Sequence, residues 1–471
     1  MRVRTTRRGG PVLALVTALT LAAGATAAVT LEGGPTPVPV TPSLAPAGPP
    51  ARAALLPAPT SAGPVPTPSG LQVVVDAVLA DPALAGRLAV SIVDAGTGKP
   101  LFERAADAPM LPASTAKIVS AVAVLIALPP GQRLTTRVVA GAAAGEVVLV
   151  GGGDPTLAGA DPDADPDADP DAATEPGYPA PARLPDLAAQ VRAALGARAV
   201  TRVLVDESLY SGERLGPGWK PSYVLAGDVA PVGPLMIDGG RVVPGRSRRH
   251  ADPALVAGQA LAMLLSPGVS VTVERGTAAP GAAPLGEVAS PTVSQLVERM
   301  LIRSDNDLAE ALVRQVALVR GQPASFAGAA VALGQVLAEV GVEGVSLADG
   351  SGLSRLDRVE PAALTRLLAR VVSGADPRLV PLLTGLPVAG FVGTLADRYR
   401  TDDGGGPAAG VVRAKTGTLN GVSALAGLVR TADGRLLAFA LTADGVPLGA
   451  TRGAEAALDR LATSLAGCGC R

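Results

Sequence analysis

The sequence predicts an α/β (α+β) fold in two parts, in which a smaller domain is inserted into a larger one made of helices and strands. Apolar residues change repeatedly between helical and strand-like spacing, and the composition changes at the borders of residues 152–285. At 471 residues and 48% hydrophobic side chains, the chain is long enough for two or three domains with large cores.

The larger part is expected to comprise residues 71–151 and 286–466. It opens with an apolar-patterned helix from Leu71, followed by two strand-like runs at 88–94 and 100–104 that a glycine-rich turn joins. Its other predicted elements are a helix over 114–128, a strand over 147–150, a helix from 293 that ends at Ser304, a helix over 308–319, strands over 411–418, 424–430 and 436–441, and a helix over 454–465.

The inserted domain, residues 152–285, alternates helical segments with strand-like runs at 200–205 and 269–273. Near its start, an acidic Asp/Pro/Ala repeat at 161–171 has the composition of a solvated surface loop. The repeat lacks the glycine and the distal glutamate of an EF-hand, so its spaced carboxylates are a weak basis for a calcium site.

Both ends of the chain lie outside these domains. Residues 1–31 place arginines before an apolar run of about 20 residues, as a cleaved signal peptide or a transmembrane anchor does. Either alternative predicts export to the cell envelope or beyond, with membrane contact only through this segment. Residues 32–70 form a proline-rich linker, and residues 467–471, with Cys468 and Cys470, form a tail.

Composition excludes several classes of function. The formal net charge of −1 provides no basic surface for nucleic acid. The only histidine, His250, lies in an arginine-rich stretch, which disfavours a Ser-His-Asp triad. Both cysteines lie in the last four residues, which disfavours a thiol nucleophile or a zinc site. The sequence implies no metal and no organic cofactor.

Three short motifs indicate an acyl-transfer site that uses serine and lysine: Ser114-Thr115-Ala116-Lys117, Ser304-Asp305-Asn306 and Lys415-Thr416-Gly417. The chain has only four lysines beside 36 arginines, and two of the four lie in these motifs. A lysine retained where arginine is the usual cation suggests a need for an amine that can lose its proton. Burial or a neighbouring cation could supply the lowered pKa.

The spacing of the motifs suggests a role for each residue. Ser114 and Lys117 share one face at the start of a helix, so the amine can take the hydroxyl proton. The Ser304 motif lies on the connection between two helices, where polar side chains can face a cleft. There Asn306 can orient the lysine or a substrate amide, and Lys415 adds a positive charge on a strand.

The chain resembles the penicillin-recognising serine enzymes, and among them the class C low-molecular-mass penicillin-binding proteins, the D-alanyl-D-alanine carboxypeptidase/endopeptidases of peptidase family S13. The resemblance covers residues 71–466. The strings that carry it are Pro112-Ala113-Ser114-Thr115-Ala116-Lys117, Gly153-Asp154-Pro155-Thr156, Arg303-Ser304-Asp305-Asn306, Asp349-Gly350-Ser351-Gly352-Leu353-Ser354-Arg355, Gly393-Thr394-Leu395 and Ala414-Lys415-Thr416-Gly417-Thr418-Leu419.

The resemblance implies a β-lactamase/transpeptidase-like fold with an antiparallel sheet flanked by helices. It implies a serine-type D-Ala-D-Ala carboxypeptidase that acts on peptidoglycan stem peptides, with diaminopimelate in them, and that β-lactam antibiotics inhibit. Ser114 would be acylated, Lys117 would be the general base, and Ser304 with Asn306 would line the opposite wall. The expected substrate-binding residues are Lys415, Thr416, Gly417 and Thr418, with Arg355, Asp206 and Tyr210 near the diaminopimelate side chain, and the backbone N–H groups of Ser114 and Thr418 would form the oxyanion hole.

One departure and two alternatives remain open. The chain is shorter between Ser114 and Ser304 than the fuller family members, which carry a third domain nested in the second, so we expect two globular domains. A β-lactamase of the same superfamily is an alternative, although no obvious glutamate for deacylation is present. A non-catalytic sensor of β-lactams or muropeptides is the other. The balance of carboxypeptidase and endopeptidase action and the oligomeric state stay open.

Overall fold

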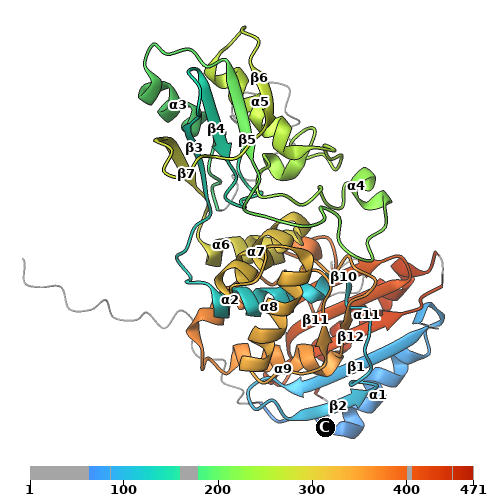
Figure 1. The fold of residues 1–471 in the computed structure, drawn as a ribbon. Helices are drawn as coiled ribbons and strands as arrows, with labels where there is room; N and C mark the ends of the chain where they lie inside the picture. The colour runs from blue at the N-terminus through green and yellow to red at the C-terminus, as the bar shows by residue number, and fades with distance from the viewer. Residues whose placement is uncertain (1–62, 85, 160–178, 400–405, 448, 470–471) are drawn as a thin grey trace, which may run out of the picture. The chain divides into compact units, whose positions relative to one another are not determined.

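The computed structural model describes residues 63–84, 86–159, 179–399, 406–447 and 449–469 (Figure 1). The predicted signal peptide or anchor, most of the linker and the acidic repeat lie outside these ranges. Within them, no helix combines the length and apolar character needed to cross a membrane.

The first sheet has five antiparallel strands in the order β10-β11-β12-β1-β2. The strands are β1 (Arg87–Asp94), β2 (Pro100–Arg104), β10 (Val412–Leu419), β11 (Val422–Arg430) and β12 (Leu436–Asp444). Strands β1 and β12 pair along their length, so segments from opposite ends of the chain meet in the middle of the sheet. The expected N-terminal hairpin and the three C-terminal strands are confirmed.

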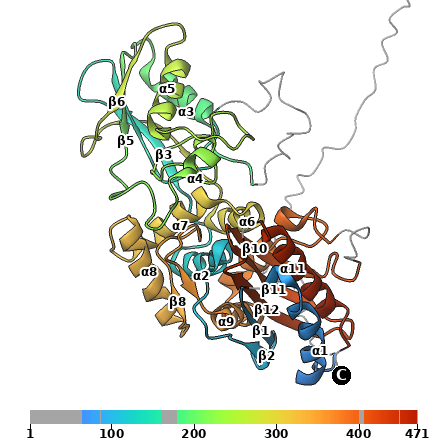
Figure 2. The same ribbon diagram turned by 90° about the vertical axis from the view of Figure 1, so that its right-hand side faces the viewer.

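Helices cover both faces of this sheet because its central strands are apolar on both sides. On β11, Leu425 belongs to one hydrophobic core and its neighbour Ala426 belongs to the other, as the alternation of a strand requires. Figure 2 shows α1 and α11 together on one side of the sheet, with α2 and α9 on the other. The helices of this part are α1 (Pro68–Leu79), α2 (Ala116–Ala127), α6 (Val293–Arg303), α7 (Asn306–Val319), α8 (Phe326–Glu339), α9 (Pro361–Val372), α10 (Val380–Gly385) and α11 (Thr451–Ala466).

The second sheet has the order β6-β5-β4-β3-β7 and is mixed, because β4, β5 and β6 run parallel to one another. Its strands are β3 (Thr135–Ala140), β4 (Glu146–Val150), β5 (Arg202–Asp206), β6 (Thr272–Arg275) and β7 (Pro284–Ala289). Helices α3 (Leu184–Leu195) and α5 (Pro253–Leu265) pack on one face and share a core with it. A short helix, α4 (Ser222–Ala226), lies between β5 and α5 in the chain.

This sheet corrects the expected borders of the insertion. We placed residues 135–151 in the larger part and began the inserted domain at residue 152. In the structure, β3 and β4 belong to the second sheet, and β7 extends that sheet to Ala289. The apolar pattern of a strand does not indicate which sheet the strand joins. Strand β4 belongs to the second sheet because it pairs in parallel with β5, which lies more than 50 residues later in the chain.

The C-terminal border also differs in detail. Helix α11 ends at Ala466, close to the expected position. Cys468, which we assigned to a tail, is only 5% exposed and packs in the core under the first sheet. Cys470 lies outside the described residues.

Candidate active site

The turn that carries Ser114 is a single turn of 3₁₀ helix immediately before α2. Ala113 in this turn has a φ of +46°, which is costly for a residue with a Cβ atom. A side chain on Gly352 would collide with the Ala113 carbonyl oxygen, and one on Gly417 would lie 2.7 Å from the Pro112 carbonyl oxygen. Gly417, which we expected to bind substrate, thus also allows the turn of Ser114 to approach β10 closely.

Lys117, in the first turn of α2, is fully buried, and its amine meets three oxygen atoms. Nζ lies 3.0 Å from Ser114 Oγ, 2.6 Å from Asn306 Oδ1 and 2.6 Å from the carbonyl oxygen of Ser351. Thus the structure joins the first two motifs through one amine, and it adds Ser351, to which the sequence assigned no role.

Burial lowers the pKa of Lys117 to about 8, and the nearby carboxylates of Asp349 and Glu310 oppose part of this effect. The sequence left open whether burial or a neighbouring cation lowers the pKa of this lysine, and burial is the larger cause. A substantial fraction of the amine is neutral near pH 8, and a neutral amine 3.0 Å from a hydroxyl can accept its proton.

The second motif forms the corner between α6 and α7. Ser304 caps α6 in a left-handed conformation with φ +54°, and Asp305 caps α7 by accepting a hydrogen bond from Leu308 N–H. Asn306 is the first residue of α7. This sharp corner turns Ser304 and Asn306 toward the same region, as expected for a motif between two helices.

Lys415, on β10, connects the second motif to the third. Its Nζ donates hydrogen bonds to Ser304 Oγ at 2.9 Å and to the Thr416 carbonyl oxygen at 2.9 Å. The side chain is fully buried. Burial holds the pKa of Lys415 well below its usual value, and the positive charges of Lys117 and Arg398 lower it further.

Strand β10 is an edge of the first sheet, and part of its free side is covered by the chain near Pro387. Ala414 N–H donates to the Pro387 carbonyl, and the Val412 carbonyl accepts from Ala389 N–H. Because successive residues alternate along a strand, the N–H groups of Thr416 and Thr418 also point to this edge.

The hydroxyl groups of these two threonines already have partners. Thr416 Oγ1 lies 2.9 Å from the hydroxyl of Thr394, and Thr418 Oγ1 donates to a carboxylate oxygen of Glu455 on α11. The Thr394 contact was accessible to sequence reasoning, because the string Gly393-Thr394-Leu395 carries part of the resemblance. Glu455 gave no comparable signal.

A segment between β5 and α5 in the chain contacts the second motif and the residues near it. The carbonyl oxygen of Asp228 accepts a hydrogen bond from Asn306 Nδ2 at 2.8 Å, and Ala230 N–H donates to Asp307 at 2.7 Å. Trp219 Nε1 donates to the Asp349 carboxylate at 2.6 Å. Sequence reasoning missed these contacts because they join residues that are far apart in the chain, and because Trp219, Asp228 and Ala230 belong to no motif.

The three residues expected near the diaminopimelate side chain, Arg355, Asp206 and Tyr210, have different surroundings from one another. Arg355 Nη1 donates to the carbonyl oxygen of Asn420, just after β10, at 3.1 Å. Asp206, at the end of β5, is buried and accepts hydrogen bonds from two backbone N–H groups at 2.8 Å. The Tyr210 hydroxyl donates to the Ala311 carbonyl at 3.3 Å, and burial raises its pKa to about 12. The described contacts of Asp206 and Tyr210 do not reach the three motifs, and their substrate role stays a prediction.

Comparison with known proteins gives the family that the sequence motifs suggested. The model of the D-Ala-D-Ala carboxypeptidase 3 (S13) family matches residues 71–248 and 244–465. Carboxypeptidase DacB of Mycolicibacterium smegmatis is 42% identical over 86% of this chain and 86% of its own length. A carboxypeptidase of Mycobacterium tuberculosis is 40% identical over 86% of this chain and 85% of its own length. A D-alanyl-D-alanine carboxypeptidase of Actinomadura sp. is 31% identical over 79% of this chain and 80% of its own length.

The fold has a solved counterpart in penicillin binding protein 4 from Haemophilus influenzae. The two structures superimpose with a TM-score of 0.65 at 21% sequence identity, over 84% of this chain and 98% of the other. This likeness confirms the expected fold class, an antiparallel sheet flanked by helices with an α/β insertion. The family match and the relatives, which span most of the chain, show that this protein belongs to the S13 family of D-Ala-D-Ala carboxypeptidases.

Proposed function

We propose that this protein is a serine D-Ala-D-Ala peptidase that forms an acyl-enzyme on Ser114. One observation carries the proposal. A buried amine with a lowered pKa lies 3.0 Å from the Ser114 hydroxyl, and a second amine, Lys415, lies 2.9 Å from Ser304. The relatives named above are carboxypeptidases, which supports the same reaction class.

In the proposed acylation step, Lys117 takes the proton of Ser114 as the oxygen attacks the carbonyl carbon of the penultimate D-alanine. The N–H of Thr418, which points to the free edge of β10, and the N–H of Ser114 stabilise the oxyanion. Ser304, hydrogen-bonded to Lys415, relays the proton held by Lys117 to the nitrogen of the departing D-alanine as the C–N bond breaks, which leaves Lys117 neutral again. Water then attacks the ester and gives its proton to Lys117, which returns it to Ser114 as the acyl group leaves.

The terminal carboxylate of the substrate is assigned to Lys415 and Thr416. Burial disfavours the protonated form of Lys415, and an incoming carboxylate would favour it. The hydroxyl of Thr418 donates to Glu455 and would have to exchange that partner to bind the carboxylate. Peptidoglycan stem peptides are the proposed substrates, and β-lactams are the proposed inhibitors. Penicillin binding protein 4 of Haemophilus influenzae, a fold relative, is known in complex with a β-lactam.

The test is incubation of the full chain with a labelled penicillin beside a Ser114→Ala variant, followed over time by intact mass. The proposal expects a long-lived one-to-one adduct on the parent and none on the variant. A transient adduct with rapid turnover of the drug would replace it with the β-lactamase alternative. No adduct on either protein would leave a non-catalytic sensor.

We also propose that the protein is exported, with residues 1–31 serving as signal peptide or membrane anchor. The arginines before an apolar run of about 20 residues support this assignment. N-terminal sequencing of the protein from membrane and culture-fluid fractions tests it. An intact N-terminus in the cytoplasmic fraction alone would contradict it.

A further inference from the structure

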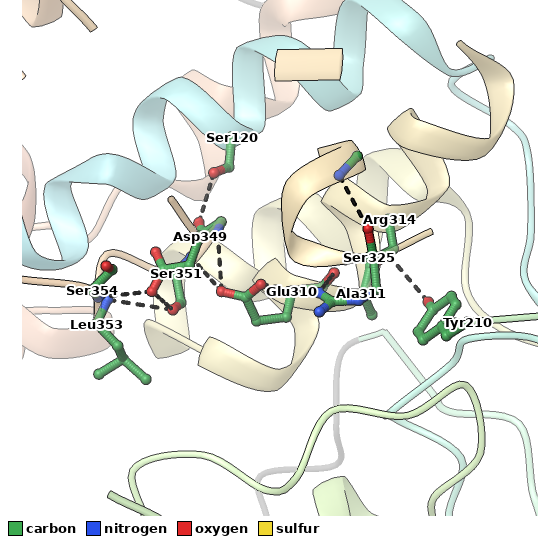
Figure 3. A network of polar contacts seen from close by, with 12 residues as sticks. Ser120, Tyr210, Glu310, Ala311, Arg314, Ser325, Asp349, Ser351, Leu353 and Ser354 are labelled. Atoms are coloured by element: carbon green, nitrogen blue, oxygen red, sulfur yellow. Dashed lines mark hydrogen bonds and ion pairs between the residues drawn. The ribbon is translucent and has the colours of Figure 1, made fainter. Parts of the chain in front are cut away.

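A loop of six residues, 349–354, folds around two buried carboxylates, those of Asp349 and Glu310 (Figure 3). It lies within the connection between β8 (Val345–Ser346) and β9 (Arg358–Val359). The Asp349 carboxylate accepts hydrogen bonds from the N–H groups of Gly352 and Ser354, both at 2.7 Å. Glu310 of α7 provides the second carboxylate, so the conformation of the loop depends on a neighbouring helix as well as on itself.

Glu310 binds two successive backbone groups of this loop. Its Oε1 accepts from Gly350 N–H at 3.0 Å and from Ser351 N–H at 2.9 Å. The carbonyl of Ser351 is the group that accepts from Lys117 Nζ at 2.6 Å. Glu310 therefore binds the N–H of the same residue, Ser351, whose carbonyl oxygen accepts from the Lys117 amine.

The loop has a second, uncharged support. The Ser120 hydroxyl, one helical turn after Lys117 on α2, donates to the Gly350 carbonyl at 2.6 Å. Figure 3 shows Ser120 and Glu310 reaching the loop from different helices. Removal of either support leaves buried backbone groups without their hydrogen bonds, but only Glu310 also adds charge.

Glu310 is itself held in place by a buried ion pair. Its Oε2 lies 3.0 Å from Arg314 Nη1, one turn further along α7, and both side chains are at most 1% exposed. The guanidinium lies over the ring of Phe326, with 4.1 Å between the Cζ atom and the ring centroid. Burying two charges is costly, so this pair is weak evidence of a role in stability alone.

We infer that Glu310 is a positioning residue for the reaction proposed above, acting through the Gly350–Ser351 peptide to hold the Ser351 carbonyl against Lys117. Through that carbonyl it places the amine beside the Ser114 hydroxyl. The inference rests on the proposed function. Glu310 has no described contact with Ser114, and so it is not assigned a catalytic role.

The charge of Glu310 provides a readout that a purely structural role would not move. The carboxylates that raise the pKa of Lys117 against burial are, in decreasing order, those of Asp349, Glu310, Asp305 and Asp307. Burial raises the pKa of Glu310 itself to about 7, so its charge is present above that pH. Glutamine at position 310 keeps an acceptor oxygen for the loop but removes this charge. The amine then stays neutral at lower pH, so the acid limb of the pH–rate profile must move to lower pH.

The experiment measures the second-order rate constant of Ser114 acylation by penicillin from pH 5 to 10, using full-length parent and Glu310→Gln. The variant should lose about 10- to 100-fold at the alkaline plateau, because the amine is less well placed. Its acid limb should move down by roughly half a pH unit. The double variant Glu310→Gln/Arg314→Met, which removes the unpaired guanidinium, should repeat both effects if the single variant folds poorly.

Two further variants sharpen the result. Ser120→Ala should lower the plateau by a few-fold without moving the acid limb, because it removes an uncharged support. Glu339→Gln breaks an exposed pair with Arg320 at the far end of α7 and should leave the whole profile unchanged.

The outcomes separate the inference from the proposed function. A parent that is not acylated at Ser114 overturns both. A parent that is acylated, with Glu310 variants that keep its acid limb and lose rate only in proportion to their folded fraction, overturns the inference alone and makes Glu310 structural.

Discussion

The surroundings of the site bury many charged side chains, whereas the strands of the second sheet bury one, Asp206 at the end of β5. Around the site, at least six ionisable side chains are less than 5% exposed: Lys117, Lys415, Asp307, Glu310, Arg314 and Asp349. In the second sheet, Arg202 is about half exposed where it pairs with Glu146 and Glu274. The core of that sheet consists of valine, leucine and alanine.

The fold thus bears the energetic cost of burying charged side chains mainly around the site. A buried charge is unfavourable unless hydrogen bonds and opposite charges compensate it, whereas an exposed pair costs little and contributes little. The site needs buried amines, because burial is what lowers the pKa of Lys117 and Lys415. The second sheet has no such requirement, and a plain apolar core suffices. Four predictions test this contrast, from the largest expected effect to the smallest.

Lys117→Met should reduce acylation of Ser114 by penicillin by about 10³-fold, because it removes the proposed base while filling a similar volume. Intact mass measured over time gives the rate. Lys99→Met, at an exposed position on the turn before β2, is the matched control and should react like the parent. Acylation of Lys117→Met at the parental rate would remove Lys117 from the mechanism.

Arg249→Met should lower the free energy of unfolding by about 3 kcal/mol, because it leaves the buried carboxylate of Asp307 without its cation. The pair is 3.0 Å apart, and its side chains are 4% and 1% exposed. Chemical denaturation of parent and variant measures the change. A loss below about 1 kcal/mol would place this pair with the exposed ones and weaken the contrast.

The acylation rate should rise about tenfold per pH unit below the pKa of Lys117 and level off above it, since only the neutral amine accepts a proton. That pKa is about 8, below the value of 10.5 for an exposed lysine. The folded state therefore binds fewer protons than the unfolded state between these values, and this group makes stability increase with pH there. A rate profile with its midpoint near 10 would show that burial does not tune the amine.

Arg202→Ala should change the free energy of unfolding by less than about 1 kcal/mol and leave acylation unchanged. Arg202, half exposed, lies 3.6 Å from Glu146 and 3.3 Å from Glu274. Because salt screens exposed charges, even this small effect should vanish in concentrated salt. Thermal unfolding at low and high salt provides the measurement, and a large loss would mean that the second sheet also depends on its charges.

Sequence patterns were sufficient for most elements and for the three motifs. The hairpin of β1 and β2, the corner at Ser304 and the strand of Lys415 were all expected, because each follows from local periodicity and turn residues. The borders of the insertion were wrong, since pairing of β4 with β5 depends on a distant partner. The support of Lys117 by Ser351 was likewise outside the reach of local patterns.

By itself, the sequence determined the chemistry available to this protein: a serine and a lysine one helical turn apart, a second lysine on a strand, and a composition that disfavours a thiol nucleophile or a zinc site. The tertiary structure decided what that chemistry can do. It buried both amines, brought Asn306 to 2.6 Å from Lys117, and placed Glu310 behind the loop that meets the amine. Proton affinity and position depend on burial and on contacts between distant segments, and these exist only once the chain has folded.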